Sequence, residues 1–202
     1  MKKILIINGG QVYDESTGKF NKTLTEWTSG FLRDNGYEVR ISKTAEHYDV
    51  TKEIDNFVWA EVIIFHTPIW WFQVPNRLKL YIDDVFQQGR GIIYKSDGRT
   101  RSNPEYNYGT GGLLQGRKYM ITTSWNAPEG AFTIPGEIMY GFPPDKGVLY
   151  GFHIAMKFVG LSKLEGMHFY DVAKGLTPER LSHYHNTYLE HLKKLFGNQI
   201  HE

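Results

Sequence analysis

The chain has 202 residues, of which 41% are hydrophobic and 22% charged, and its formal net charge is +1 at pH 7. This length suffices for one domain with a sizeable core, and the balanced charge gives no electrostatic footprint for nucleic acid or an anionic membrane. The sequence contains no cysteine, which excludes disulfides, thiolate catalysis and cysteine-ligated metals.

No segment of the sequence has the length and composition of a membrane span or a signal peptide. The first apolar run, at 4–7, is too short for the core of a signal peptide. We therefore expect a cytoplasmic protein without membrane insertion. Because no repeat or shift in composition divides the chain, we predict a single domain over 1–202, with an irregular excursion at 90–117.

Strands and helices alternate in the first part of the chain. Residues 4–7 form a continuous apolar run, which is typical of a strand buried on both faces. After a glycine pair, apolar side chains at helical spacing predict a helix over 21–35, and 37–41 alternates like a more exposed strand. Thr51 is the predicted cap of a short following helix.

Residues 62–65 are a second continuous apolar run, and a loop with three adjacent aromatic side chains between two prolines follows it. Each proline fixes its own φ and disfavours helix at the preceding residue, so we predict that the next helix starts near Val74 and stops near Gly89. We interpret Asp83 and Asp84 on that helix as a solvated pair, because no histidine or third carboxylate is spaced to join them.

The second half of the chain continues the alternation. Residues 118–122 predict a fourth strand, which ends in a polar and aromatic loop. The segment 130–147 is loop-like, 150–161 predicts a mostly buried helix, and 164–170 predicts the fifth strand. A threonine cap followed by a proline at 177–178 then starts the last helix.

Five strands that alternate with helices predict an α/β fold with a doubly wound parallel sheet. The expected strand order is 2-1-3-4-5, with helices on both faces. The first, third and fourth strands are neighbours in that order, so the loops at their carboxyl ends converge on one edge. Open α/β sheets bind their ligands at this edge.

The three converging loops offer groups that suit a flat, phosphorylated ligand. The first loop leads into a helix whose free N–H groups and positive dipole suit a phosphate, with added charge from Lys22. The aromatic loop offers a wall for a ring system, although the same side chains could instead fill a core or an interface. The loop after the fourth strand offers hydrogen bonds to the edge of a heterocycle. Together these features predict a flavin nucleotide.

Other motifs with a chemical meaning are absent from the sequence. There is no G-x-G-x-x-G after the first strand, no G-x-x-x-x-G-K-[ST], no H-E-x-x-H and no G-x-S-x-G. These absences disfavour Rossmann-type dinucleotide binding, P-loop chemistry, a metalloprotease-type zinc site and acyl transfer by serine.

Several longer segments, spread over nearly the whole chain, resemble one family. They are Ile4-Leu5-Ile6-Ile7-Asn8-Gly9, Leu24-Thr25-Glu26, Pro68 with Trp70-Trp71, Tyr81-Ile82-Asp83-Asp84-Val85-Phe86, Ser96-Asp97-Gly98-Arg99-Thr100-Arg101, Tyr108-Gly109, Gly111-Gly112-Leu113 and Trp125-Asn126-Ala127-Pro128. Each segment alone is a weak signal, but the set is specific. On this set the chain resembles the flavodoxin-like NAD(P)H:quinone oxidoreductases.

The resemblance implies a flavodoxin-like fold, FAD as cofactor, NADPH as hydride donor, and a homodimer with its site at the subunit interface. The implied reaction is the two-electron reduction of a quinone by hydride transfer through the flavin, with no side chain assigned as catalytic and no metal. The pyrophosphate and ribityl chain would contact Ser16, Thr17, Gly18, Lys19, Phe20, Asn21, Lys22 and Thr23. The isoalloxazine would lie along Pro68, Ile69, Trp70, Trp71 and Phe72. Its pyrimidine edge would contact Thr123, Ser124, Trp125, Asn126 and Ala127, and Tyr108 would contact FAD in its own or the partner subunit.

Three other functions use the same predicted features. A flavodoxin-like one-electron carrier would have no substrate of its own, but such carriers are usually strongly acidic and this chain is not. An FMN-dependent nitro or azo reductase would use the same flavin seat with another acceptor. A flavin-free interaction module would use the aromatic loop as a protein interface.

Overall fold

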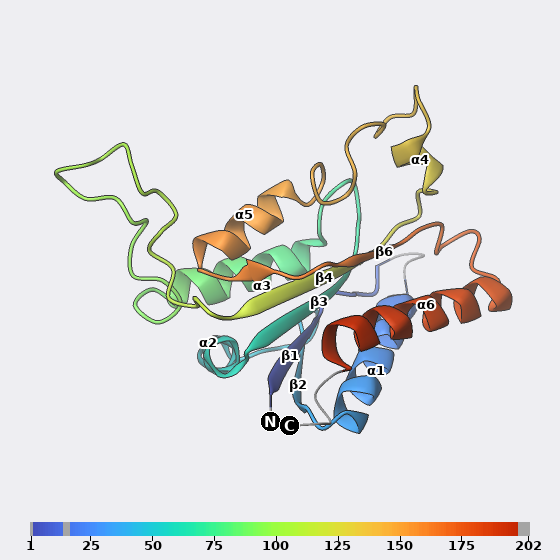
Figure 1. The fold of residues 1–202 in the computed structure, drawn as a ribbon, viewed down its shortest axis with the longest axis horizontal. Coiled ribbons are helices and arrows are strands. Elements are labelled where there is room, and N and C mark those ends of the chain that lie inside the picture. The colour runs from blue at the N-terminus through green and yellow to red at the C-terminus, as the bar shows by residue number, and fades with distance from the viewer. Residues whose placement is uncertain (1, 14–16, 198–202) are drawn as a thin grey trace.

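The computed structural model describes residues 2–13 and 17–197 and shows a parallel sheet with helices on both faces (Figure 1). The strands are β1 (Lys3–Asn8), β2 (Glu38–Lys43), β3 (Val62–Pro68), β4 (Lys118–Ser124), β5 (Ser162–Lys163) and β6 (Met167–Phe169). The helices are α1 (Lys19–Asp34), α2 (Val50–Trp59), α3 (Asn76–Gln88), α4 (Gly130–Thr133), α5 (Tyr150–Phe158) and α6 (Pro178–Phe196). Among these helices, none combines the length and the apolar composition needed to cross a membrane.

The strand order is β2-β1-β3-β4-β5, which confirms the predicted order and the doubly wound fold. In place of one strand at 164–170, the chain forms two short strands, β5 just before that range and β6 within it, and both pair parallel with β4. Between them is Gly166, whose backbone lies so close to β4 that a Cβ there would be 2.2 Å from the carbonyl oxygen of Ile121.

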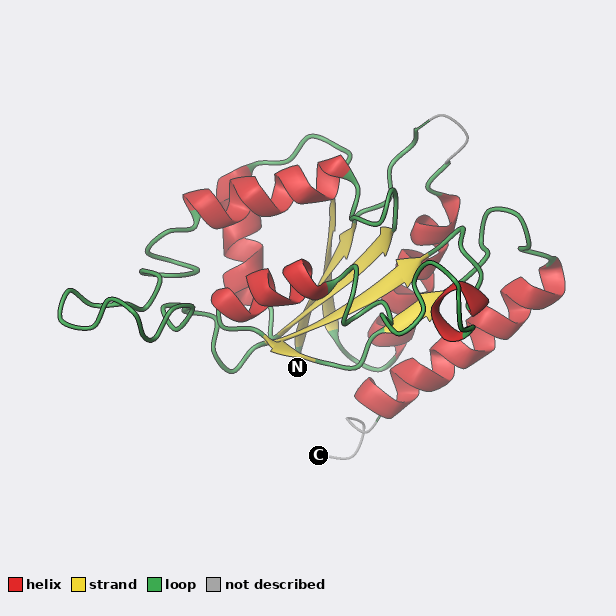
Figure 2. Cartoon of the chain, turned by 90° about the horizontal axis from the view of Figure 1, so that it is seen from above, coloured by secondary structure: helices red, strands yellow, loops and turns green. Residues whose placement is uncertain are grey.

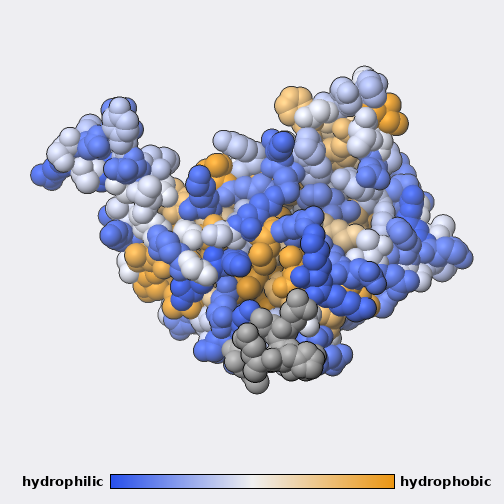
Figure 3. Space-filling view, viewed as in Figure 1, coloured by the Kyte–Doolittle hydropathy of each residue, from blue (hydrophilic) through white to orange (hydrophobic). Residues whose placement is uncertain are grey.

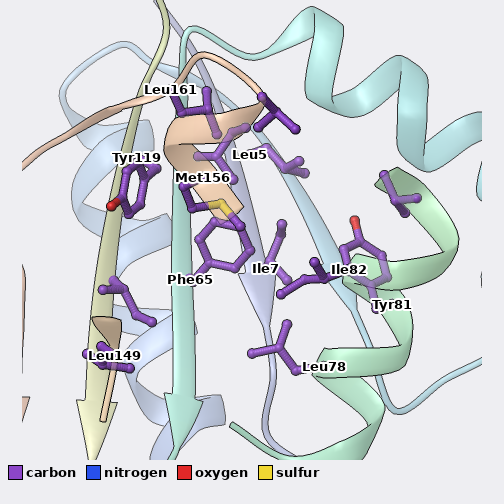
Figure 4. Packing of buried hydrophobic residues seen from close by; sticks show 14 of the residues in the cluster. Leu5, Ile7, Phe65, Leu78, Tyr81, Ile82, Tyr119, Leu149, Met156 and Leu161 are labelled. Carbon is purple, nitrogen blue, oxygen red and sulfur yellow. The ribbon is translucent and has the colours of Figure 1, made fainter. Parts of the chain in front are cut away.

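The sheet separates two apolar clusters, because successive side chains of a strand point to opposite faces. Leu5 and Ile7 of β1 pack with α2, α3 and α5, whereas Ile4 and Ile6 pack with α1 and α6 (Figures 1 and 2). Figure 4 shows the first cluster, in which Phe65 of β3 lies close to Met156 of α5. This two-sided burial explains the continuous apolar runs in the sequence.

The starts of two helices differ from the predictions. Helix α3 starts at Asn76 rather than near Val74, because Pro75 occupies the cap position with extended backbone at φ −56° and ψ 150°. Helix α2 is capped by Asp49 rather than Thr51, since the Asp49 carboxylate accepts a hydrogen bond of 3.1 Å from the Lys52 N–H.

Helix α5 ends at Phe158 and is much less buried than predicted. Met156 is its one fully buried side chain, while Tyr150 and Ile154 are 62% and 45% exposed. The segment is apolar on almost every side, so its composition alone does not show which stripe faces the sheet. The predicted loop at 130–147 contains the one-turn helix α4.

Residues 89–117 form an arm that projects from the body of the molecule (Figures 1 and 3). Its backbone is linked by isolated bridges, such as Tyr94 to Gly112, and it contains no helix or extended strand. The arm includes the whole segment 90–117 that was predicted to be irregular. It carries Tyr108, which is 68% exposed.

Candidate functional site

Three loops meet at the carboxyl edge of the sheet. The ring of Tyr13 lies 5.7 Å from the ring of Trp70, measured between centroids, which joins the loops after β1 and β3. The Ile69 N–H donates to the Ser124 carbonyl oxygen at 2.9 Å, and the Asn21 side-chain amide donates to the Ser124 hydroxyl at 3.3 Å. The loops that the sequence predicts to converge therefore do so.

The amino end of α1 lacks a side-chain cap. Its cap residue is Gly18, with φ +66°, and the first bond within the helix runs from the Lys22 N–H to the Gly18 carbonyl oxygen at 3.1 Å. In the described part of the chain, the N–H groups of Lys19, Phe20 and Asn21 have no hydrogen-bond partner. Free N–H groups at the positive end of a helix are a seat for an anion.

Gly10 packs closely against this helix end. A Cβ on Gly10 would lie 2.9 Å from the Asn21 Cβ and 3.0 Å from the Asn8 side-chain oxygen, so no larger residue fits without movement. Two side-chain oxygens, those of Asn21 and Gln11, are buried without a hydrogen-bond partner among the described residues. Buried acceptors of this kind require a donor, and the hydroxyls of a ribityl chain would supply one.

The predicted residues of the first loop do not all point into this space. Phe20 packs against the core, with its ring 5.3 Å from that of Phe169, so a cofactor contact at this position would use its backbone N–H. Thr17 and Lys22 are exposed at the helix end, and Lys22 also lies 3.8 Å from Glu26. Ser16 lies outside the described residues.

The aromatic loop is a tight turn with an unusual backbone. Trp70 and Gln73 exchange two backbone hydrogen bonds of 2.9 and 3.0 Å, and the two residues between them have positive φ, 48° at Trp71 and 60° at Phe72. Two positive φ values are those of a type I′ turn, which normally contains asparagine and glycine. The conformation presents Trp71 to solvent, 93% exposed, and Phe72 beside it, 46% exposed.

The residues at the base of this turn belong to the interior. Ile69 is 9% exposed and lies in the core cluster, and Pro68 is the last residue of β3. The Ile69 side chain is thus part of the core, and its predicted contact with a bound ring stays a prediction. Trp70, Trp71 and Phe72 are placed to form a wall. The alternative that all three aromatic side chains fill a core is excluded by the exposure of Trp71.

The loop after β4 offers its backbone rather than its side chains. Thr123 is fully buried, and Trp125 packs on Phe132 with ring centroids 5.0 Å apart, so both side chains are held in the interior. The Trp125 backbone N–H donates to the carbonyl oxygen of Phe169, the last residue of β6. The Ala127 carbonyl oxygen accepts from the N–H of Asp171, just after that strand. The N–H groups of Asn126 and Ala127 have no partner among residues 2–13 and 17–197, and they are free for the edge of a heterocycle.

Tyr108 lies away from this edge, along a groove between α3 and α5. The groove has a volume of about 780 Å³, begins beside the aromatic turn at Gln73 and Val74, and includes Phe158, whose ring centroid is 5.7 Å from that of Tyr108. Sequence reasoning missed the groove. The available signal was the spacing of Tyr150, Ile154 and Phe158, which places three apolar residues on one helical stripe.

A second group that sequence reasoning missed is a polar network around Asp145. His153 lies 2.9 Å and His168 3.7 Å from one Asp145 oxygen, and Lys163 contacts the other oxygen. Burial alone would raise the pKa of Asp145, but the hydrogen bonds from His153 and Lys163 hold it below its ordinary value. Burial lowers the pKa of His168 to about 4, so this histidine is neutral at pH 7.

A third polar group surrounds His66 of β3, whose side chain is fully buried. Its two ring nitrogens lie 3.0 Å from the Thr28 hydroxyl and 2.6 Å from the Thr122 hydroxyl. Thr28 donates to the Leu24 carbonyl oxygen and also contacts the Tyr188 hydroxyl at 2.8 Å. Burial lowers the pKa of His66 to about 3, so the ring is neutral and every polar atom is paired.

Comparison with known proteins places the chain among flavodoxin-like proteins. A family model described as "Flavodoxin-like fold" matches residues 2–192. The chain is 41% identical to an uncharacterized protein of Schizosaccharomyces pombe over 196 residues, which cover 97% of this chain and 98% of that protein. It is 40% identical to NADPH:quinone oxidoreductase MdaB of Haemophilus influenzae over 195 residues, which cover 96% and 99% of the two chains.

A solved structure supports the same fold. A candidate quinone reductase of Klebsiella pneumoniae superposes with a TM-score of 0.73 at 21% identity, covering 97% of this chain and 85% of that one. Shorter matches include FMN-dependent NADH:quinone oxidoreductase 2 of Pseudomonas syringae, 34% identical over 88 residues, which cover 42% of this chain and 37% of that protein. The family model and the full-length relatives agree with the observed sheet, and the chain belongs to the flavodoxin-like fold family.

Proposed function

We propose that this protein is a flavin-dependent NAD(P)H:quinone oxidoreductase that reduces quinones by two electrons. The observation that carries the proposal is the amino end of α1, which among the described residues is uncapped and has an unpaired buried Asn21 oxygen, beside an exposed and strained aromatic turn. A full-length relative at 40% identity is named for this activity, which supports the proposal independently.

Each part of the site would hold one part of a flavin nucleotide. The free N–H groups at 19–21 would bind phosphate, and the side-chain oxygens of Asn21 and Gln11 would accept from ribityl hydroxyls. Trp71 and Phe72 would lie against the ring, and the N–H groups of Asn126 and Ala127 would bond to its pyrimidine edge. When bound, the flavin supplies the hydride chemistry between nicotinamide and quinone.

The energies show why the phosphate seat is needed. Nanomolar affinity corresponds to roughly −12 kcal/mol. An aromatic contact adds only about 0.5–1.5 kcal/mol beyond the area it buries. The turn alone therefore cannot hold the cofactor, and the amino end of α1 must contribute much of the affinity.

FAD, with NADPH as its reductant, is the form of the cofactor that we propose. Its support is the family resemblance, together with the name of the H. influenzae relative for NADPH. FMN is the second candidate, because shorter matches are named FMN-dependent. The same α1 seat would hold the phosphate of FMN or the first phosphate of FAD. The cytoplasmic location stays a prediction.

We also propose that the active protein is a homodimer. The groove between α3 and α5 is lined by exposed apolar side chains, including Tyr150 and Ile154, and Tyr108 of the arm is also part of its lining. A groove lined largely by apolar side chains is a favourable place for another molecule to bind. A second copy would cover this groove, and Tyr108 would then reach the partner's cofactor.

The proposal is tested by the visible spectrum of the purified protein and by turnover. We expect flavin absorbance bands, release of FAD on denaturation, and steady-state oxidation of NADPH that depends on added menadione. Identification of the released flavin by mass distinguishes FAD from FMN. A colourless protein that binds no added flavin would contradict the proposal, and a coloured protein without turnover would indicate an electron carrier.

A further inference from the structure

The polar network around Asp145 connects the elements that surround the end of β4. Asp145 lies in the segment between α4 and α5, and its contacts come from α5 through His153, from β5 through Lys163 and from β6 through His168. Both histidines extend further, His153 to the Tyr119 hydroxyl at 2.8 Å and His168 to the Thr123 hydroxyl at 2.7 Å. Tyr119 and Thr123 are both residues of β4.

Donor and acceptor counts give the branch through His168 a single direction. The Trp125 indole N–H only donates, so among the described residues the buried Thr123 hydroxyl has only the Nδ1 of His168 to receive its own proton, and Nδ1 must accept. The ring proton is then on Nε2, which lies 3.7 Å from Asp145, beyond hydrogen-bond distance. The Thr123 hydroxyl therefore donates to Nδ1. The same oxygen accepts from the Trp125 indole N–H at 2.7 Å, so the Thr123 hydroxyl both donates and accepts.

This branch ends at the loop that offers backbone N–H groups to the site. Trp125 is 3% exposed. Its backbone N–H donates to the carbonyl oxygen of Phe169 at 2.8 Å, and Phe169 is next to His168 in β6. The indole and the backbone of Trp125 are thus both held by β6, directly or through Thr123. Asn126 and Ala127, whose N–H groups are free, are the next two residues.

We propose that His168 is a positioning residue that fixes Thr123 and Trp125 and thereby aims the Asn126 and Ala127 N–H groups at the edge of the bound ring. This inference rests on the proposed function and extends it to residues that do not touch the cofactor. The low pKa of His168 agrees with it, since a protonated ring could not accept from Thr123.

A matched pair of variants distinguishes the hydrogen bond at the Nδ1 of His168 from the contact on its Nε2 side. An asparagine places its side-chain oxygen near the former Nδ1, so His168→Asn keeps an acceptor for Thr123. A glutamine reaches toward Asp145 instead, so His168→Gln leaves the buried Thr123 hydroxyl without its acceptor. The readout is the dissociation constant of riboflavin and of FMN, measured by fluorescence titration at pH 7.

We expect His168→Gln to weaken riboflavin and FMN by the same factor, about tenfold or more, as expected for one unsatisfied buried group. His168→Asn should stay within about threefold of the wild type. Equal factors for the two ligands place the effect at the ring rather than at the phosphate. Thr123→Val, which removes the hydroxyl and keeps the shape, should reproduce the loss and serves as the test if His168→Gln does not fold.

Each remaining outcome counts against the positioning role. Wild-type affinity in both His168→Gln and Thr123→Val would overturn it, and so would equal losses in the Asn and Gln variants, because a merely structural role would not distinguish them. A wild-type protein that binds neither riboflavin nor FMN would overturn the proposed function as well. Binding by the wild type is therefore measured first, so that the two failures are told apart.

Discussion

Trp71 and Phe72 hold a backbone conformation that L-residues with side chains rarely adopt. A left-handed conformation costs roughly 1–2 kcal/mol per residue for residues other than glycine. Strain of this kind persists where the surrounding structure and function require it. Here it turns an indole outward that would otherwise be buried, which fits a contact surface for a ring and does not fit a contribution to stability.

The strained turn predicts that relieving its backbone strain raises the free energy of unfolding and lowers flavin affinity. Replacing Trp71→Asn together with Phe72→Gly installs the residues that a type I′ turn prefers. We expect the free energy of unfolding to rise by roughly 1–3 kcal/mol, measured by urea titration at fixed protein concentration, while flavin affinity falls. Trp71→Ala alone should lower flavin content and turnover. A double variant no more stable than the wild type would refute the strain.

His66 predicts how stability depends on pH. Its pKa is about 3 in the folded protein, because of burial, and about 6.5 in the unfolded chain, so between these values only the unfolded chain binds the proton. This contribution is complete above pH 6.5, and stability falls as pH drops, by roughly 1.4 kcal/mol per pH unit. Urea unfolding at several pH values between 5 and 7.5 measures the slope.

The control for this prediction is a histidine at the surface. His66→Gln removes the buried titrating ring and should make the pH slope shallower, although the variant is less stable at every pH. His183→Gln, at an exposed position of α6, should leave the slope as it is. Identical slopes in wild type and His66→Gln would show that the buried ring is not the source.

Two tryptophans show how far the sequence predicts the site at this scale. Trp71 and Trp125 both lie in proline-containing loops at strand ends, and both were expected at the cofactor. Trp71 points outward because of a backbone conformation that no glycine or asparagine announces. Trp125 points inward because its N–H finds the Thr123 hydroxyl two residues earlier. Neither fact follows from composition or periodicity.

At the scale of elements, α1 combines two roles along one helix. Its buried stripe, including Leu24 and Leu32, packs under the sheet, whereas its amino end is left open by Gly18. The periodicity of apolar residues predicts the first role directly. The open end was predictable only as a tendency of helix starts, because the missing cap and the unpaired Asn21 oxygen depend on the tertiary structure.

The glycines of α1 and its preceding loop predict a selective effect on the phosphate seat. Gly10→Ala would place a Cβ 2.9 Å from the Asn21 Cβ, so we expect FMN affinity to fall about tenfold or more. Riboflavin should lose less affinity than FMN, because it would lose the ribityl contact to Asn21 but has no phosphate contact to lose. The matched control is Gly30→Ala. Gly30 lies in α1, with open space where its Cβ would be, so this variant should bind FMN normally.

The outcome that would contradict the seat is an equal loss of FMN and riboflavin in Gly10→Ala. Gly30→Ala should also raise the free energy of unfolding by up to roughly 1 kcal/mol, because alanine is favoured over glycine inside a helix. That gain provides an internal check that the measurement resolves effects of this size.

At the scale of the whole molecule, the sequence predicted the sheet but not which helix faces would be exposed. Two-sided apolar runs at β1 and β3 imply helices on both faces, and the order β2-β1-β3-β4-β5 follows from them. Which face of α5 remains uncovered could not be predicted, because the helix is apolar on most sides. The family resemblance alone suggested a second subunit.

The exposed stripe of α5 predicts that assembly can be blocked without unfolding. Ile154→Asp puts a charge into the groove, at a side chain that is 45% exposed, so the chain should fold and remain single. We expect sedimentation velocity to show two copies for the wild type and one for the variant, with turnover strongly reduced. Val58→Asp, at an exposed position of α2 outside the groove, should remain paired. A monomeric wild type, or a paired Ile154→Asp, would contradict the dimer.

The buried polar ring in β3 also determines how the strands can align. His66 stands opposite Thr122 in the ladder, and its neighbours Phe65 and Ile63 face the other side of the sheet. A slip of one residue would turn His66 into that apolar cluster, away from both hydroxyls that satisfy it. A chain that folds with β3 misaligned therefore buries an unsatisfied imidazole, and the correct alignment is selected before any ligand arrives.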